Sequence, residues 1–207
     1  MIKVKICGLT CVEDTLAAVE AGADALGFVF AEGRRRVTME QVRAISAALP
    51  PFVSTVGVFV DEDLAFVRQV ADFCRLDVLQ FQGDESPDYC ASFSRRVIKG
   101  FKVKDETSLA RLEAYDVTAY LLDSYVAGRS GGTGRTFDWE LVKGLTASRP
   151  VILAGGLTPT NVSRAIAMLH PYAVDVSSGV EHESGGKDHQ KMVDFVRRAK
   201  GTVSGLE

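Results

Sequence analysis

Two side chains that can transfer protons each stand at the end of a predicted strand. Cys7 ends the apolar run IKVKIC (2–7) and is followed at once by Gly8, and Asp123 ends the run TAYLLD (118–123). Thiols and carboxylates both serve as general acids and bases in enzymes. A strand-end cysteine is more often a small packed hydrophobe, and an aspartate is often a helix cap. Because no helical pattern begins within several residues of Asp123, capping is disfavoured there.

Glycines and serines follow two further predicted strands, in the segments AGGLTP and DVSSGVE. Glycine lets the backbone approach an anion closely, and serine adds a hydroxyl to the backbone N–H groups. A short helix starting near Val180 would add partial positive charge at its N-terminus. Two loops of this kind favour a phosphate-binding site over two plain glycine turns. The candidate phosphate-binding residues are Gly155, Gly156, Ser177, Ser178 and Gly179.

The elements that would position these residues alternate along the chain. Strand-like runs occupy 2–7, 23–30, 53–60, 77–82, 96–103, 118–123, 150–156 and 172–179. Between them lie stretches whose apolar spacing, near 3.6 residues, is typical of helices. These stretches are EDTLAAVEAG, MEQVRAISAALPP, DLAFVRQVADF, SLARLEAY, TNVSRAIAML and HQKMVDFVRRAK, with PDYCASFS and DWELVKGL as shorter, weaker patterns. Because no linker rich in Pro, Gly or Ser divides the chain, we expect one domain over 1–207.

Eight strands alternating with eight helices predict an α/β fold with a parallel sheet. A chain of 207 residues favours a closed (β/α)8 TIM barrel, at the small end of that fold's size range. An open doubly wound sheet would usually carry GxGxxG after its first strand, and CGLTCVED does not match. Active sites of such barrels lie at the C-terminal ends of the strands, and phosphate commonly binds after strands 7 and 8. The barrel would therefore place Cys7, Asp123 and both glycine-bearing loops at one end.

Composition excludes several classes of protein. The formal net charge is −3, and the run Arg34–Arg36 is too short for a polybasic tail, so no nucleic-acid surface is indicated. No signal-peptide core and no run of about 18 apolar residues is present, so no membrane segment is expected. The four cysteines form no CxxC and no Cys/His cluster, which argues against a metal site or a disulfide framework. We expect a protein of the reducing cytoplasm.

Motifs along nearly the whole chain match one enzyme family, and the first and last of them are specific to it in order and spacing. They are KICGLT (5–10), GADALGFVF (22–30), LPPFVSTVGVFVDE (49–62), GGTGRTFDW (131–139), LAGGLTPTNV (153–162), AVDVSSGVE (173–181) and GGKDHQKM (185–192). On these motifs the chain resembles the phosphoribosylanthranilate isomerase family of tryptophan biosynthesis. Related phosphate-binding barrels share the glycine loops but not the cysteine after the first strand.

The resemblance implies a reaction and roles for two residues. The family catalyses an Amadori rearrangement of N-(5′-phosphoribosyl)anthranilate to 1-(2-carboxyphenylamino)-1-deoxyribulose 5-phosphate, without a metal or organic cofactor. Asp123 would be the general acid that protonates the furanose ring oxygen, and Cys7 the general base that removes the C2′ proton. A free thiol is mostly protonated at neutral pH, so nearby cations should tune it. Lys5, on the same side of its strand as Cys7, and Arg35 are the candidates.

The resemblance further implies an arginine that binds the anthranilate carboxylate. The segment FAEGRRRVT aligns Arg35 with it, although the loop is one residue shorter than usual and Gly33 replaces the usual serine. Arg34 and Arg36 remain alternatives, and a solvated basic loop is the non-functional interpretation. A planar guanidinium suits a carboxylate because it can donate two parallel hydrogen bonds.

Two further positions invite comparison with the family. Asp175 lies two residues before Ser177 and should share its face of the strand. The resemblance implies that Asp175 contacts a substrate hydroxyl, but an ion pair with a lysine of the first strand is as well supported. After the fourth strand the chain has QFQGDE where the family usually has QLHGxE, so Gln82 stands in place of a histidine. Any role of this loop is left open.

Two other functions compete with this interpretation. A related sugar-phosphate isomerase or epimerase, such as a histidine-pathway barrel, would share the phosphate loops, but it resembles a duplicated half-barrel with aspartates after strands 1 and 5. Here these strands end in Cys7 and FKVKDE. A barrel that only binds a phosphorylated ligand would have no reason to keep both Cys7 and Asp123.

The remaining expectations concern a long loop and the partners. Residues 124–136 hold four glycines. We interpret this long segment as a lid over Asp123 rather than as a disordered surface excursion. It lacks the ending GK[ST] that a P-loop would have.

The expected partner is a small phosphorylated substrate, without nucleic acid or membrane. The chain would act as a monomer or a homodimer.

Overall fold

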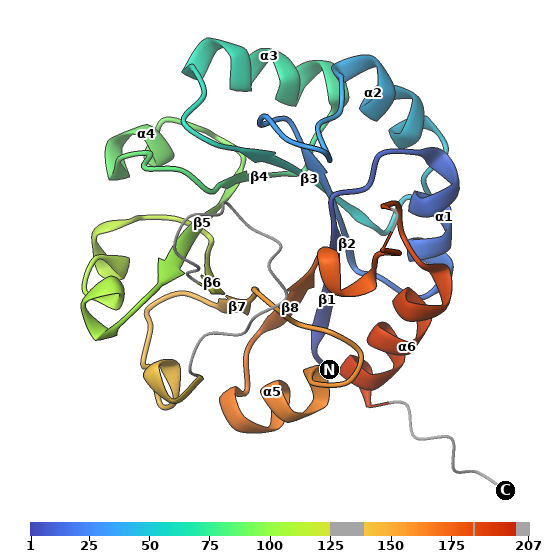
Figure 1. Ribbon diagram of the computed structural model, residues 1–207. Helices are drawn as coiled ribbons and strands as arrows, with labels where there is room; N and C mark the ends of the chain where they lie inside the picture. The colour runs from blue at the N-terminus through green and yellow to red at the C-terminus, as the bar shows by residue number, and fades with distance from the viewer. Residues whose placement is uncertain (125–138, 184, 202–207) are drawn as a thin grey trace, which may run out of the picture.

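Eight parallel strands close into a barrel in the computed structural model, which describes residues 1–124, 139–183 and 185–201. Neighbours around the barrel follow chain order, and β8 pairs with β1 to close it. The strands are β1 (Lys3–Cys7), β2 (Ala25–Val29), β3 (Ser54–Phe59), β4 (Val78–Phe81), β5 (Arg96–Val103), β6 (Ala119–Ser124), β7 (Val151–Leu153) and β8 (Ala173–Val176). Figure 1 shows the helical segments around the outside. The predicted (β/α)8 barrel is confirmed.

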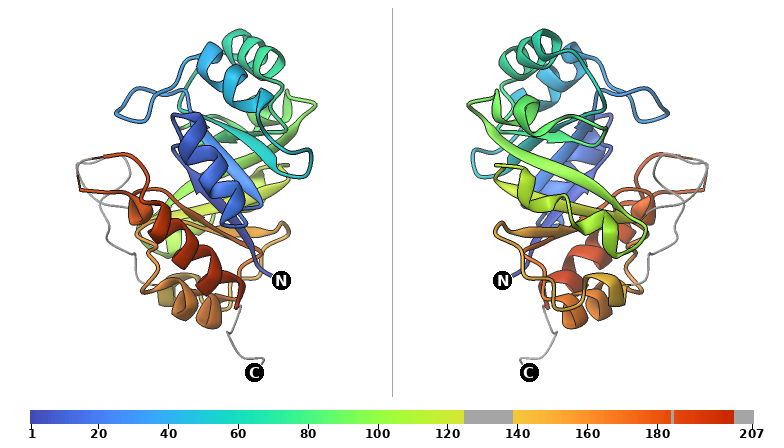
Figure 2. Two further views of the ribbon diagram at one scale, coloured as in Figure 1. Left: turned by 90° about the vertical axis from the view of Figure 1, so that its right-hand side faces the viewer. Right: turned by 90° about the vertical axis from the view of Figure 1, so that its left-hand side faces the viewer.

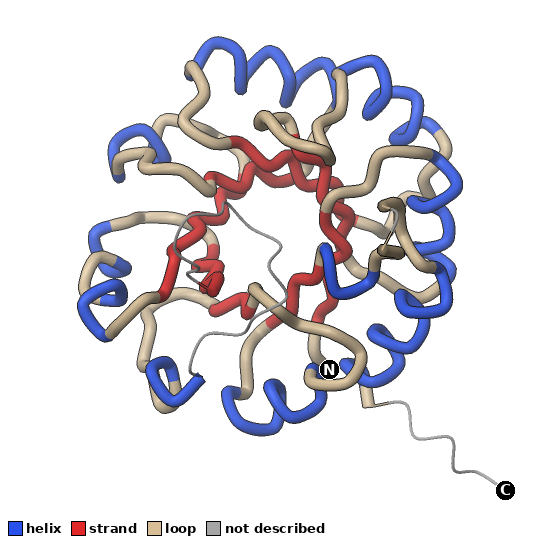
Figure 3. The backbone as a smooth tube through the Cα atoms, viewed as in Figure 1, coloured by secondary structure: helices blue, strands red, loops and turns tan. Residues whose placement is uncertain are grey.

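The outer ring combines α-helices with 3₁₀ turns, and it encloses the ring of strands (Figure 3). The α-helices are α1 (Val12–Glu20), α2 (Met39–Ala47), α3 (Leu64–Cys74), α4 (Pro87–Ala91), α5 (Val162–Leu169) and α6 (His189–Lys200). The 3₁₀ turns are η1 (Glu106–Leu109), η2 (Leu112–Ala114), η3 (Trp139–Val142) and η4 (Ser178–Val180). Thr38 begins α2 with a reciprocal capping box to Gln41, as its sequence position favours.

The prediction of a helix over SLARLEAY, between β5 and β6, was wrong. The segment forms the 3₁₀ turns η1 and η2 instead. Asp105 accepts a hydrogen bond from the hydroxyl of Thr107 at 2.6 Å and another from the backbone N–H of Ser108 at 3.1 Å. Such local side-chain bonds compete with the α-helical hydrogen-bond pattern. The weak pattern DWELVKGL likewise yields only η3 among the residues that the structure describes.

Apolar side chains fill both faces of the barrel wall, as expected for parallel strands that are covered on both sides. The large outward-facing residues, such as Phe28, Phe81 and Leu122, pack against the helices. The interior layer is smaller and consists of Val56, Val78, Ile98, Ala119, Leu121, Ile152, Ala154 and Ala173. Toward the carboxyl ends of β1, β6 and β8, polar side chains follow this apolar layer. The side views place the segments after β2 and β8 at one end of the barrel (Figure 2).

A buried ion pair ties β5 to the loop after β4. The ammonium nitrogen of Lys99 lies 3.1 Å from Glu85 Oε2 and 2.7 Å from the carbonyl oxygen of Gly83. The two charged side chains are only 3% and 2% exposed. Glu85 also accepts the backbone N–H of Asp61 at 2.9 Å, so the pair joins the loops after β3 and β4.

Replacing Lys99 by methionine is expected to lower the free energy of unfolding by ~3–5 kcal/mol, because Glu85 would stay buried without its cation. Urea denaturation measures the loss. The matched control is Lys3→Met, whose side chain is 53% exposed and pairs with Asp24 at 2.9 Å. An exposed pair of this kind contributes about 0–1 kcal/mol. Equal losses in the two variants would contradict a structural role for the buried pair.

Candidate active site

The thiol of Cys7 lies at the carboxyl end of β1, inside the barrel wall. Cys7 is 7% exposed and pairs in register with Gly27 of β2. A Cβ atom added at Gly27 would lie 2.7 Å from Cys7 Sγ and 3.1 Å from Lys5 Cε. The absence of a side chain at Gly27 therefore makes room for both the thiol and the Lys5 stem. The predicted placement of Lys5 on the same side as Cys7 agrees with this contact.

Lys5 forms a buried ion pair with Asp175 of β8. Its Nζ lies 2.9 Å from Asp175 Oδ1, and the two side chains are 4% and 10% exposed. This is the ion pair that the sequence left open for Asp175. Burial opposes the charge of Lys5, but the carboxylate of Asp175 and the neighbouring Cys7 outweigh it and raise the pKa of Lys5 to about 12. Lys5 is therefore an ammonium group beside the thiol at neutral pH.

Some groups around Cys7 favour its thiolate and others oppose it. Burial raises the pKa of the Cys7 thiol; Lys5 lowers it, Asp175 raises it, and Lys187 lowers it. The net pKa is raised, so the two cations reduce the cost of burying a thiolate without removing it. The expectation that cations tune Cys7 holds for Lys5, while Lys187 supplies the second positive charge. Sequence reasoning did not single out Lys187, although it lies in the motif GGKDHQKM.

Arg35 is the arginine of the 34–36 run that packs against the end of β1. A side chain at Gly8, the residue after Cys7, would collide with Arg35 Cδ. Arg35 is 20% exposed, whereas Arg34 and Arg36 are 59% and 52% exposed. Both Arg34 and Arg35 pair with Glu181, and Arg36 pairs with the exposed Glu32.

Asp123 lies on β6 and contacts the glutamine that replaces the usual histidine. Gln82 Nε2 donates to Asp123 Oδ2 at 3.4 Å, and Gln82 Oε1 accepts from Gln80 Nε2 at 3.1 Å. A side chain at Gly100 would collide with the Gln82 amide, so this glycine makes room for it. An amide thus contacts Asp123 from the position where the family usually has a histidine. Most of the loop interpreted as a lid, 125–136, lies outside the described residues.

The two glycine-bearing loops contact each other at the ends of β7 and β8. Gly155 and Gly156 have φ values of +80° and +66°, which favour glycine. Asn161 stabilises this turn because its Nδ2 donates to the Gly156 carbonyl oxygen at 2.9 Å. A side chain at Gly179 would collide with the carbonyl oxygen of Leu157, so glycine is required where the loops meet.

The 3₁₀ turn η4 follows β8 and begins at Ser178, close to the expected helix start. The buried hydroxyl of Ser177 has no hydrogen-bond partner among the described residues. It lies 3.0 Å from where a Cβ of Gly8 would stand, beside the end of β1. A donor without a partner at this position suits a bound polar ligand.

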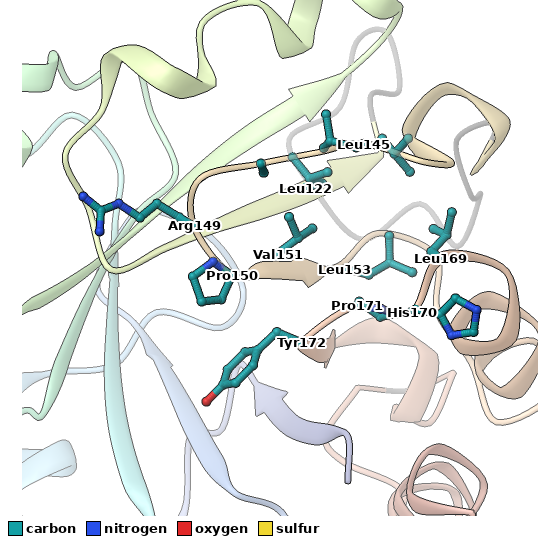
Figure 4. Close-up of a pocket in the computed structure, with 12 residues that line it drawn as sticks. Leu122, Leu145, Arg149, Pro150, Val151, Leu153, Leu169, His170, Pro171 and Tyr172 are labelled. Atoms are coloured by element: carbon teal, nitrogen blue, oxygen red, sulfur yellow. The ribbon is translucent and has the colours of Figure 1, made fainter.

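A pocket of about 390 Å³ lies away from these residues. Leu122, Leu153 and Leu169 contribute apolar side chains to it, and Pro150 and Tyr172 also line it (Figure 4). Pro150 and Tyr172 directly precede β7 and β8, so the pocket lies near the amino ends of these two strands. It contains none of the candidate residues and is not the catalytic site.

Within the described ranges, no group of three or more His, Cys, Asp and Glu side chains is arranged to hold a metal ion. Among the same residues, every helix is too short or too polar to cross a membrane.

Comparison with known proteins decides the family. A profile of the N-(5′-phosphoribosyl)anthranilate (PRA) isomerase family matches residues 4–198. The N-(5′-phosphoribosyl)anthranilate isomerase of Pelobacter propionicus is 54% identical over 205 residues, which cover 99% of this chain and 98% of the relative. The chain belongs to this family. It is an isomerase of tryptophan biosynthesis.

Solved structures of the family agree with the fold of this isomerase. The phosphoribosylanthranilate isomerase of Thermotoga maritima has a TM-score of 0.92 and 43% identity, covering 97% of this chain and 100% of that chain. Another structure describes monomers generated from the dimeric Thermotoga maritima enzyme, with a TM-score of 0.85, 39% identity and the same coverage. A third holds reduced 1-(o-carboxyphenylamino)-1-deoxyribulose 5-phosphate, with a TM-score of 0.84 and 40% identity, again covering 97% and 100%. The family and the fold predicted from the sequence are confirmed.

Proposed function

We propose that this isomerase converts N-(5′-phosphoribosyl)anthranilate into 1-(2-carboxyphenylamino)-1-deoxyribulose 5-phosphate with Asp123 as general acid and Cys7 as general base. The observation that carries the proposal is the buried Cys7 thiol at the end of β1, which shares the space over Gly27 with the Lys5 stem and whose thiolate is favoured by the charges of Lys5 and Lys187. Asp123 stands at the end of β6, which is separated from β1 by β7 and β8 around the barrel. An acid and a base on different sides of the barrel mouth can act on different sides of one sugar.

The reaction then consists of one ring opening and a series of proton transfers. Asp123 gives a proton to the furanose ring oxygen, and cleavage of the C1′–O bond opens the ring to a protonated Schiff base. The Cys7 thiolate removes the C2′ proton, and the electron pair of that C–H bond moves toward the nitrogen to give an enolamine. Protonation at C1′ and loss of the enol proton yield the ketone. Reactant and product are isomers, so no electron acceptor or donor is consumed.

Substrate binding is assigned to three groups of residues. The phosphate is proposed to bind between the loops after β7 and β8, through Gly155, Gly156, Ser177, Ser178 and Gly179. Arg35 would bind the anthranilate carboxylate through its guanidinium. Asp175, held by Lys5 through Oδ1, would accept a hydrogen bond from a substrate hydroxyl through Oδ2. The ion pair and the hydroxyl contact are therefore compatible.

The phosphate assignment predicts the effect of Gly179→Ala. The added methyl group would push the β8 loop away from the Leu157 carbonyl oxygen. We expect KM to rise about tenfold, equivalent to about 1.4 kcal/mol of lost affinity, with a smaller change in kcat. Inhibition by inorganic phosphate should weaken in parallel. An unchanged inhibition constant for phosphate would place the anion elsewhere.

The cysteines bear on the cellular compartment of the enzyme. All four cysteines are unpaired, which is typical of the reducing cytoplasm. We propose that residues 1–207 fold as one domain there and act as a monomer or a homodimer. Size-exclusion chromatography with light scattering distinguishes the two assemblies.

A further inference from the structure

A buried carboxylate, Glu181, holds the arginine that is proposed to bind the substrate. Glu181 directly follows η4, and its side chain is 6% exposed. Arg35 donates to it twice, from Nε to Oε1 at 2.7 Å and from Nη2 to Oε2 at 3.0 Å. These two donors form one edge of the guanidinium. The edge formed by Nη1 and the second Nη2 proton can therefore donate to another carboxylate.

Glu181 is itself held in place from several sides. Lys187 Nζ lies 2.9 Å from Oε1, and the backbones of Glu181 and Lys187 form an antiparallel bridge. Lys191 Nζ donates to the backbone carbonyl oxygen of Glu181 at 2.9 Å. Burial alone would raise the pKa of Glu181, but Arg35 and Lys187 lower it to about 2. The carboxylate is thus bound by several partners and ionised at any pH used for assay.

The same contacts bring Arg35 to the catalytic base. The Arg35 stem lies against Gly8, the residue that follows Cys7. Lys187, which shares Oε1 of Glu181 with Arg35, is one of the two cations that favour the Cys7 thiolate. Arg34 also pairs with Glu181, so cations outnumber carboxylates in this cluster. One acceptor therefore orients Arg35 without cancelling the positive charge that a substrate carboxylate requires.

We propose that Glu181 is a positioning residue that holds one edge of the Arg35 guanidinium and thereby presents the other edge to the substrate carboxylate. The inference rests on the proposed function in one respect, the assignment of Arg35 to that carboxylate. Through Arg35, Glu181 acts only on recognition of the substrate carboxylate, whereas any effect through Lys187 acts on every substrate. A purely structural ion pair between the loops after β2 and β8 would instead affect every substrate equally.

The test compares two substrates that differ by one group. N-(5′-phosphoribosyl)anthranilate carries the carboxylate, and N-(5′-phosphoribosyl)aniline lacks it. For Glu181→Gln we expect the ratio of kcat/KM between the two substrates to fall about tenfold or more, mainly through KM of the anthranilate. Effects transmitted through Lys187 to Cys7 act on both substrates and cancel in the ratio. Glu181→Asp, which keeps the charge, should restore part of the ratio.

Three further variants separate the possible outcomes. Arg35→Gln should lower the same ratio, and Glu181→Gln combined with Arg35→Gln should be no worse than Arg35→Gln alone, because the two residues act as one unit. Arg36→Gln, in the same loop but paired with exposed Glu32, is the control and should leave the ratio unchanged. Thermal unfolding verifies that each variant is folded.

The outcomes distinguish this inference from the proposed function. If Arg35→Gln lowers the ratio but Glu181→Gln reduces both substrates equally, Glu181 is structural and the positioning role is overturned. If Arg35→Gln leaves the ratio unchanged, the carboxylate assignment of Arg35 fails and the role of Glu181 fails with it. A lowered ratio in both single variants, without further loss in the double variant, supports the inference.

Discussion

Replacing Cys7 by alanine is expected to lower kcat about 10²–10⁴-fold, the usual contribution of a general base. KM should change little, because binding is assigned to the phosphate loops and Arg35. The wild-type kcat/KM should rise with pH through neutrality, since the base must be deprotonated and burial raises the pKa of the Cys7 thiol. This rise should disappear in Cys7→Ala. Loss of substrate fluorescence follows the turnover of the aminobenzoate group.

Two control variants show whether the loss of activity comes from the Cys7 thiol itself. Cys7→Ser keeps the size of the buried side chain but has a far less acidic hydroxyl, so it should be nearly as slow as Cys7→Ala. Cys11→Ala removes a neighbouring, partly exposed thiol that makes no capping hydrogen bond, and it should leave kcat unchanged. Near-normal turnover in Cys7→Ala would remove the thiol from the mechanism.

Replacing Asp123 by asparagine is expected to lower kcat by about 10²–10⁴-fold as well. Asparagine keeps the shape of the side chain and can still contact Gln82, but it cannot protonate the ring oxygen. KM should again stay close to that of the wild type. Steady-state kinetics over a range of pH measures both parameters.

The matched control for this substitution is Asp63→Asn. Asp63 is exposed before α3, on a loop at the carboxyl end of β3, and its side chain makes no capping hydrogen bond. It should retain full activity. If Asp123→Asn also retains most of its kcat, another group supplies the proton and the acid assignment is wrong.

The features that follow from strand alternation were predictable from the sequence. Lys5 was placed beside Cys7 because residues two apart share a face, and the structure brings their side chains together at Gly27. The barrel itself followed from eight repeated strand and helix patterns. The helix predicted over SLARLEAY does not form, because Asp105 accepts hydrogen bonds from Thr107 and Ser108. In so short a segment these local bonds outweigh the helical spacing of the apolar residues.

The contacts made by loops were not predictable in the same way. Arg35 and Glu181 are 146 positions apart, and no periodicity fixes the path of either loop. The sequence left Arg34, Arg35 and Arg36 as alternatives, and only the burial of Arg35 and its packing against Gly8 distinguish it from the other two. Lys187 was part of a recognised motif, but its electrostatic influence on Cys7 depends on how the segment after β8 folds back toward β1. Burial of the thiol, which raises its pKa, likewise appears only in three dimensions.

A crystal structure of this enzyme with a reduced, unreactive analogue of its product would show directly how the sugar lies between Cys7 and Asp123. We expect the phosphate to bind between the loops of Gly156 and Gly179. We also expect the sugar carbons to lie between Cys7 Sγ and the Asp123 carboxylate, with C2′ within about 4 Å of the thiol, close enough for proton transfer. A phosphate bound elsewhere, or a C2′ carbon that reaches neither side chain, would contradict the proposed mechanism.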